Sequence, residues 1–111
     1  MAKYVIRFDP EYFATSLWAE NAAADSDFGI NIAYEKLGLS ADLIKRLEIF
    51  DDSIFEIIDW SNPGGESPLT EEERNQIYLE GLRLLELVRT ELGKDFEVEN
   101  DLDWINPKRN D

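Results

Sequence analysis

The sequence predicts one α+β domain, in which two antiparallel amphipathic helices pack on a small sheet that contains an N-terminal and a C-terminal strand. Apolar residues recur at helical spacing in two long central segments, and they alternate with polar residues near both ends. The length of 111 residues suits a single hydrophobic core. Because the chain shows neither an internal repeat nor a low-complexity linker, we expect a single domain over residues 1–111.

The first expected element is a short strand close to the N-terminus. In this segment Tyr4, Ile6 and Phe8 occupy one face, and Lys3 and Arg7 occupy the other. This period of two, carried by β-favouring residue types, is typical of a strand. If this strand pairs with the C-terminal one, parallel pairing is easy to achieve across a helical hairpin.

The segment that follows has weaker signals. A proline after Asp9 could open a short helix that reaches Leu17 and Trp18, and a loop is the alternative. Residues 19–39 are expected to form an irregular connection, because small and polar residues and two glycines dominate them. So long a connection is unusual in a compact domain, and we expect it to pack or bind through its larger side chains. These are Phe28, Ile30, Ile32 and Tyr34.

The first long helix is expected from about Ala41 to Asp59. Ser40 is a typical N-cap, and Asp42 in the first turn complements the helix dipole. One continuous face of the helix is apolar. This face consists of Leu43, Ile44, Leu47, Phe50, Ile54, Ile57 and Ile58.

Two residues break the pattern of this helix. Asp51 falls within the apolar face, and a buried carboxylate needs a partner, for which Arg74 or Arg89 of the second helix is expected. Ile49 falls on the polar face, where it is expected to be exposed and available for contact.

The second long helix has clear ends. Thr70 and Glu73 have the spacing of a capping box, and Gly93 is placed as the C-cap. Gly81 interrupts the apolar stripe, where a glycine costs about 1 kcal/mol relative to alanine. We therefore expect the facing helix to approach closely at Gly81. Residues 62–65, Asn-Pro-Gly-Gly, are expected to form an exposed loop between the two helices.

The last expected element is a strand over residues 95–104, in which acidic and mainly apolar residues alternate. Its acidic face would hold a row of carboxylates, which are Asp95, Glu97, Glu99, Asp101 and Asp103. Such a row repels itself, so it indicates either a surface that binds a cationic partner or an edge strand protected against aggregation. We expect the row to face the partner, with protection of the strand edge against aggregation as the alternative.

A second candidate surface lies at the end of the first helix. The first helix carries an acidic stripe, which is the ordinary solvent-exposed face of a helix or a weaker binding site: Glu48, Asp52, Glu56 and Asp59. Of these, Asp52, Glu56 and Asp59 are the candidate binding residues. Trp60 follows them, and a tryptophan flanked by acids is either anchored in the core or a hot spot for a basic partner.

Composition excludes several functions. The chain carries 25 acidic and 11 basic residues, for a net charge of −14, and has neither Cys nor His. Disulfides, thiol nucleophiles, imidazole catalysis and Cys or His metal sites are therefore excluded. The charge argues against direct binding to nucleic acid or an anionic membrane and favours a basic partner, although solubility alone is an alternative purpose.

No motif predicts an enzyme, a metal site or a cofactor. The sequence has no phosphate-binding loop and no nucleophile elbow. A carboxylate-based hydrolase is a weaker alternative, because nothing singles out a catalytic pair among the acids. Residues 25–29 resemble only the start of a calcium loop. No apolar run reaches 18 residues and no signal peptide is present, so a cytoplasmic location is expected.

Four segments together carry a resemblance to a known group of proteins. They are Leu37-Gly38-Leu39-Ser40, Asp59-Trp60-Ser61-Asn62-Pro63, Leu69-Thr70-Glu71-Glu72-Glu73 and Glu91-Leu92-Gly93-Lys94-Asp95-Phe96-Glu97-Val98. The chain resembles, over residues 37–98, small acidic bacterial immunity proteins that are encoded beside polymorphic or contact-dependent growth-inhibition toxins. The resemblance implies that it neutralises a toxin acting in the cytoplasm, often a basic nuclease.

The expected function is therefore that of an immunity protein. It would bind a cognate basic toxin, with a nuclease as the expected class, and cover its active site. The alternative is an acidic regulator that mimics nucleic acid and binds a DNA- or RNA-binding protein.

Overall fold

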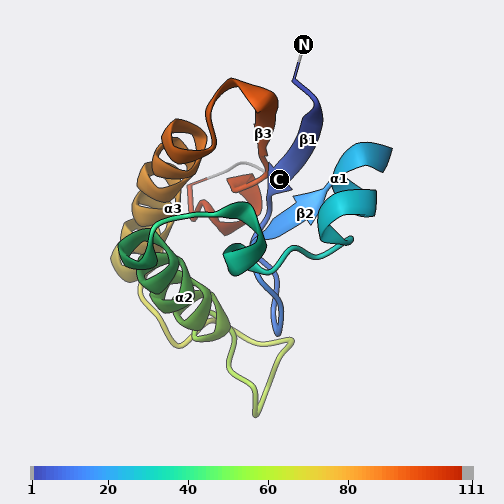
Figure 1. The fold of residues 1–111 in the computed structure, drawn as a ribbon. Coiled ribbons are helices and arrows are strands. Elements are labelled where there is room, and N and C mark those ends of the chain that lie inside the picture. Colours follow the sequence, from blue (N-terminus) through green and yellow to red (C-terminus); the bar gives the residue numbers. More distant parts are fainter. Residues whose placement is uncertain (1, 109–111) are drawn as a thin grey trace.

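The computed structural model describes residues 2–108 and shows an α+β fold (Figure 1). Its helices, strands and 3₁₀ helices (η) follow in the order β1 (Tyr4–Phe8), β2 (Leu17–Ala19), α1 (Ala22–Phe28), η1 (Tyr34–Leu37), α2 (Ala41–Phe55), α3 (Glu71–Leu92), η2 (Gly93–Asp95), β3 (Phe96–Asn100) and η3 (Asp103–Ile105).

The sheet is mixed, with strand order β2-β1-β3. β1 lies in the centre, antiparallel to β2 and parallel to β3, so the two terminal strands do pair, and they pair in parallel. Tyr4 is in register with Phe96, and Phe8 with Asn100. Parallel neighbours need a long crossover connection, which here includes both long helices.

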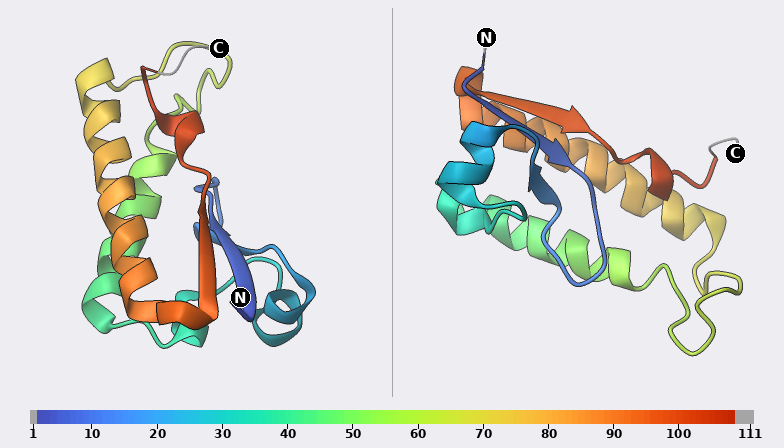
Figure 2. Two further views of the ribbon diagram at one scale, coloured as in Figure 1. Left: turned by 90° about the horizontal axis from the view of Figure 1, so that it is seen from above. Right: turned by 90° about the vertical axis from the view of Figure 1, so that its right-hand side faces the viewer.

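The two long helices lie together beside the sheet (Figure 2). The chain reverses after α2, and α3 runs back along it before leading into β3. The core forms between these layers, where the rings of Phe8 on β1 and Phe50 on α2 lie 5.8 Å apart. Leu47, Leu84 and Val88 from the two helices are fully buried. The helix α1 packs beside β1 and β2 instead.

The expectation of two helices and two strands is incomplete, because residues 2–108 form three α-helices and three strands. No helix starts after Asp9. The Asp9 amide instead donates to the Ser16 carbonyl at 2.7 Å, closing a hairpin that makes Leu17–Ala19 a strand. The connection over 19–39 is not wholly irregular either, because the Asn21 side chain accepts from the Ala24 amide and caps α1.

The caps of the long helices are confirmed. Ser40 accepts from the Leu43 amide, and Thr70 and Glu73 form both bonds of the capping box. Gly93 has a φ of +75°, the positive φ expected of a C-cap glycine, with ψ outside the left-handed region. The first helix was expected to run to Asp59, but α2 ends at Phe55.

The close approach at Gly81 is also confirmed. A Cβ atom built on Gly81 would lie 3.0 Å from Cζ of Phe50 and 3.1 Å from Cδ2 of Leu102. A real Cβ atom does not fit there unless these side chains shift, which explains a glycine in the middle of the buried stripe of α3.

The C-terminal strand is shorter than expected, because β3 ends at Asn100. The Asn100 side chain accepts from the Leu102 amide, which turns the chain out of the strand. Of the five carboxylates expected on one strand face, only Glu97 and Glu99 belong to β3. Asp101 follows it, and the other two, Asp95 and Asp103, lie in η2 and η3.

Within the described range, none of the helices is both long enough and apolar enough to cross a membrane.

Candidate functional site

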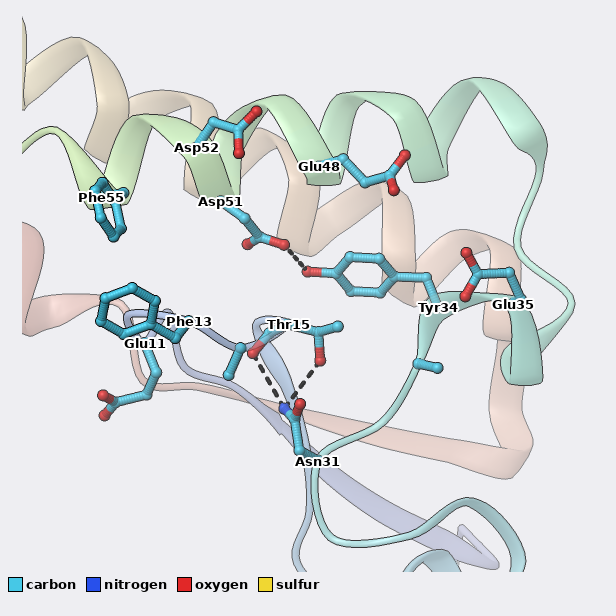
Figure 3. A pocket seen from close by; sticks show the side chains of 12 residues that line it. Glu11, Phe13, Thr15, Asn31, Tyr34, Glu35, Glu48, Asp51, Asp52 and Phe55 are labelled. Carbon is cyan, nitrogen blue, oxygen red and sulfur yellow. Dashed lines mark hydrogen bonds between the residues drawn. The ribbon is translucent and has the colours of Figure 1, made fainter.

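A cleft of about 580 Å³ opens beside α2, opposite the loop between β1 and β2 and the segment that leads into η1 (Figure 3). Its lining residues are Glu11, Phe13, Ala14, Thr15, Asn31, Ala33, Tyr34, Glu35, Glu48, Asp51, Asp52 and Phe55. We call this the acidic cleft, because five of these residues are carboxylic acids and none of them is Lys or Arg. A concave surface lined by one sign of charge focuses the field and attracts cations.

Asp51 lies at the centre of the acidic cleft. Its two carboxylate oxygens accept hydrogen bonds of 2.6 Å from the Ser16 and Tyr34 hydroxyls, and Figure 3 shows the second of these bonds. The Tyr34 hydroxyl also accepts from the Ser16 amide at 2.8 Å. This network ties α2 to η1 and to the residue that precedes β2, and it shapes the cleft.

The prediction that Arg74 or Arg89 would pair with Asp51 is wrong. Arg89 instead donates from Nε and Nη2 to the Val98 carbonyl, at 3.1 and 2.6 Å. Hydroxyl groups therefore satisfy the Asp51 carboxylate, and they do not neutralise it. Its negative charge remains available to the cleft.

Partial burial shifts the titration of this network. Burial raises the pKa of Asp51 to about 6, although the hydrogen bonds from Ser16 and Tyr34 oppose the shift. Burial and the neighbouring Asp51 charge also raise the pKa of Tyr34 above its ordinary range. Tyr34 therefore stays a neutral hydrogen-bond donor at neutral pH.

The raised pKa of Asp51 predicts how stability depends on pH. The folded chain holds this proton more tightly than the unfolded chain, so the stabilisation is full below pH 4 and is lost as pH rises through about 6. We expect Asp51→Asn to raise the free energy of unfolding by about 1–2 kcal/mol at pH 7.5, because it removes a half-buried charge. This gain should disappear by about pH 4.

Urea unfolding of the wild type and the variant at both pH values measures this difference. Asp52→Asn, an exposed neighbour on α2, is the matched control: it keeps Asp51, so it should lose stability between the two pH values as the wild type does. A difference between wild type and Asp51→Asn that is independent of pH would contradict the assignment.

Three exposed aromatic side chains lie at one end of the acidic cleft and form what we call the aromatic patch: Phe13, Phe55 and Trp60. Phe13 is 81% exposed, Trp60 41% and Phe55 38%. Phe55 and Trp60 stack with ring centroids 4.6 Å apart, and Phe13 packs against both at 5.1 and 5.3 Å. Trp60 is thus not anchored in the core, and its Nε1 donates to the Phe55 carbonyl at 2.8 Å.

The backbone of Phe13 is strained. Its φ of +66° is the one positive φ of a non-glycine residue between positions 2 and 108. For a bulky side chain this conformation is rare and costs about 1–2 kcal/mol. Such strain clusters at functional sites, and here it holds an apolar ring in solvent.

The predicted helix-end residues lie at or near this site. Asp52 lines the acidic cleft, and Trp60 belongs to the aromatic patch. Glu56 is the exposed C-cap residue of α2. Asp59 accepts from the amide and hydroxyl of Ser61, and these hydrogen bonds hold the pKa of its carboxyl below the usual range.

The predicted carboxylate row has a different environment. Glu97 and Glu99 are exposed on β3, and Glu99 is in register with Arg7. Nε of Arg7 lies 3.2 Å from Asp9 and 3.8 Å from Asp101. The Arg7 guanidinium therefore offsets part of the negative charge on this face of the sheet, whereas no basic residue lines the acidic cleft.

Sequence reasoning missed several residues of the site. Phe13 and Phe55 were not predicted to be exposed, and Ser16 was not linked to Asp51. The one available signal was Asp51 itself, an acid within an apolar helix face. Ile30 and Ile49 are exposed, at 65% and 57%, so the predicted exposure of Ile49 is confirmed.

The residues described here show no metal centre. Across residues 2–108, no group of three or more acidic side chains is arranged to hold a metal ion.

The comparisons with known proteins point to one family. The model of a family described as Serratia CdiI immunity protein-like matches residues 4–101, which is most of the chain. A search of curated proteins finds no match. The matched range contains both the acidic cleft and the aromatic patch.

Proposed function

Because the chain belongs to the Serratia CdiI immunity protein-like family, we propose that it binds a cognate toxin and neutralises it. The family identifies an immunity protein of a contact-dependent growth-inhibition system. The proposal extends to the partner: a basic toxin, with a nuclease as the class, that the chain meets in the cytoplasm. In this proposal the chain inhibits the toxin by binding over its active site, without catalysis by the chain itself.

The acidic cleft beside the aromatic patch is the observation that supports this proposal. The patch provides the exposed apolar area that anchors protein interfaces, in which aromatic residues are enriched. The five carboxyl groups of the cleft provide a charge opposite to that of a basic toxin. The overall net charge of −14 would speed the encounter by long-range attraction.

A regulator that mimics nucleic acid would share the negative charge. The family match favours the immunity function, because it names an immunity protein. The two proposals differ in partner, which the following experiment tests directly.

The test is to produce the chain together with toxin domains from contact-dependent growth-inhibition systems, beginning with any toxin domain that is encoded next to its gene. We expect cells that make both proteins to grow and cells that make the toxin domain alone to stop growing. The purified proteins should form a complex whose association rate falls about tenfold or more between low and high salt. A toxin domain from an unrelated system is the control and should not be neutralised.

Two results would contradict the proposal at different levels. Growth arrest in the presence of the chain, with no complex detected, would show that the chain does not neutralise this toxin. A complex that protects cells but associates at the same rate at all salt concentrations would support the immunity function and contradict the proposal that the toxin is basic.

A further inference from the structure

We propose that the aromatic patch, together with the adjoining acidic cleft, is the docking surface for an arginine-bearing loop of the toxin. This inference rests on the proposed function and adds to it the surface and the chemistry of recognition. The carboxylate row of β3, which the sequence suggested first, is then outside the main contact.

The exposed rings supply the apolar part of the argument. Phe13, Phe55 and Trp60 contact one another and form one continuous group. Phe13 comes from the β1–β2 loop, and Phe55 and Trp60 come from the end of α2 and the segment after it, so two distant parts of the chain converge there. Contiguous exposed apolar area of this kind marks an interaction site, whereas single exposed hydrophobic residues are ordinary.

The charge around these rings indicates the chemistry of the partner. Phe13 and Phe55 themselves line the acidic cleft, so the rings and the carboxyl groups belong to one surface. Figure 3 shows the two rings next to each other at one end, with Asp51 and Asp52 farther along α2. A guanidinium group suits both parts, because it stacks on aromatic faces and forms paired hydrogen bonds with carboxylates.

The conformation of Phe13 indicates that the surface is formed in advance. A positive φ holds this ring outward in the free protein, where Phe55 and Trp60 contact it. The ring is therefore ordered before the partner arrives, which lowers the entropy lost on binding. The positive φ lies in the turn of the β1–β2 hairpin, where glycine or asparagine is usual, and phenylalanine at this position presents a ring that is 81% exposed.

Phe13→Asn is the sharpest variant to test the docking surface. Asparagine tolerates the left-handed conformation better than phenylalanine does, so the melting temperature should stay the same or rise. Affinity for the toxin domain, measured by calorimetric titration, should fall about tenfold or more, as for the loss of an interface hot spot. Ile30→Asn is the matched control, because it removes another exposed apolar side chain from outside the patch.

Two double variants test the contribution of the carboxyl groups to binding. Glu48→Gln with Asp52→Asn removes two charges from the acidic cleft, and Glu97→Gln with Glu99→Gln removes two from β3. We expect the first pair to lower affinity about tenfold and the second to change it less than about twofold. A photo-crosslinking residue at position 13 should attach to a toxin peptide that contains arginine.

The outcomes separate the two proposals. If the wild-type chain does not bind the toxin domain, the proposed function fails. If the wild type binds and Phe13→Asn binds equally well, the aromatic patch is not the docking surface, although the immunity function stands. If only the variant with Glu97→Gln and Glu99→Gln loses affinity, the contact lies on the sheet and the inference is wrong. A crosslinked peptide without arginine would contradict the proposed arginine-bearing loop.

Discussion

Replacing Phe50 with alanine is expected to lower the free energy of unfolding by about 4 kcal/mol. Phe50 is 2% exposed and joins all three parts of the core, because its ring packs against Phe8 on β1 and covers Gly81 on α3. Alanine would leave a cavity between the sheet and both long helices. The glycine opposite has no side chain that could fill it.

Chemical denaturation of the purified variant, followed by circular dichroism, measures this loss. Ile49→Ala is the matched control, because Ile49 is the preceding residue on the same helix and is 57% exposed. The control should change the free energy of unfolding by less than about 0.5 kcal/mol, as is usual for surface positions. Similar losses in both variants would show that Phe50 is not central to the core.

Gly81→Val should lower the free energy of unfolding by about 3 kcal/mol, for the opposite reason. A side chain at this position meets the Phe50 ring and the Leu102 side chain at 3.0 and 3.1 Å from its Cβ atom alone. The two further methyl groups of valine would force the helix away from the core or Phe50 out of its rotamer. The better helix propensity of valine than glycine offsets only a few tenths of a kcal/mol.

Gln76→Val separates overpacking from helix propensity in the same denaturation experiment. Gln76 is exposed on α3, so valine there carries only the cost of a β-branched residue in a helix, about 0.5 kcal/mol. If Gly81→Val costs no more than Gln76→Val, the contact with Phe50 does not explain the glycine.

Local signals predicted the helix starts well, because a capping side chain hydrogen-bonds to a backbone amide only a few residues away in the sequence. Ser40 and Thr70 cap helices that start where the sequence indicated. The end of α2 was predicted wrongly, because the apolar periodicity of the sequence continues past the last residue of the helix. Ile57 and Ile58 extend the apolar pattern, yet the Glu56 amide bonds to the Ser53 carbonyl three residues back and α2 stops.

The candidate site was less predictable, because it depends on contacts between distant segments. The Asp51 carboxylate bonds to Tyr34 and Ser16, which lie 17 and 35 residues away and carry no motif. The hairpin that places Phe13 beside Phe55 is closed by backbone hydrogen bonds, which side-chain patterns do not reveal. Asp52 and Trp60 were identified because their acidic and aromatic character is visible without knowing the fold.

The central position of β1 has a consequence for synthesis on the ribosome. This strand is made first, but its parallel neighbour β3 emerges roughly 90 residues later, about 5–18 s at ordinary rates of translation. Until then one edge of β1 is unpaired and can pair with another chain. The sheet therefore closes only after β3 has been made, so a truncated chain that lacks β3 should be a substrate for chaperones and proteases.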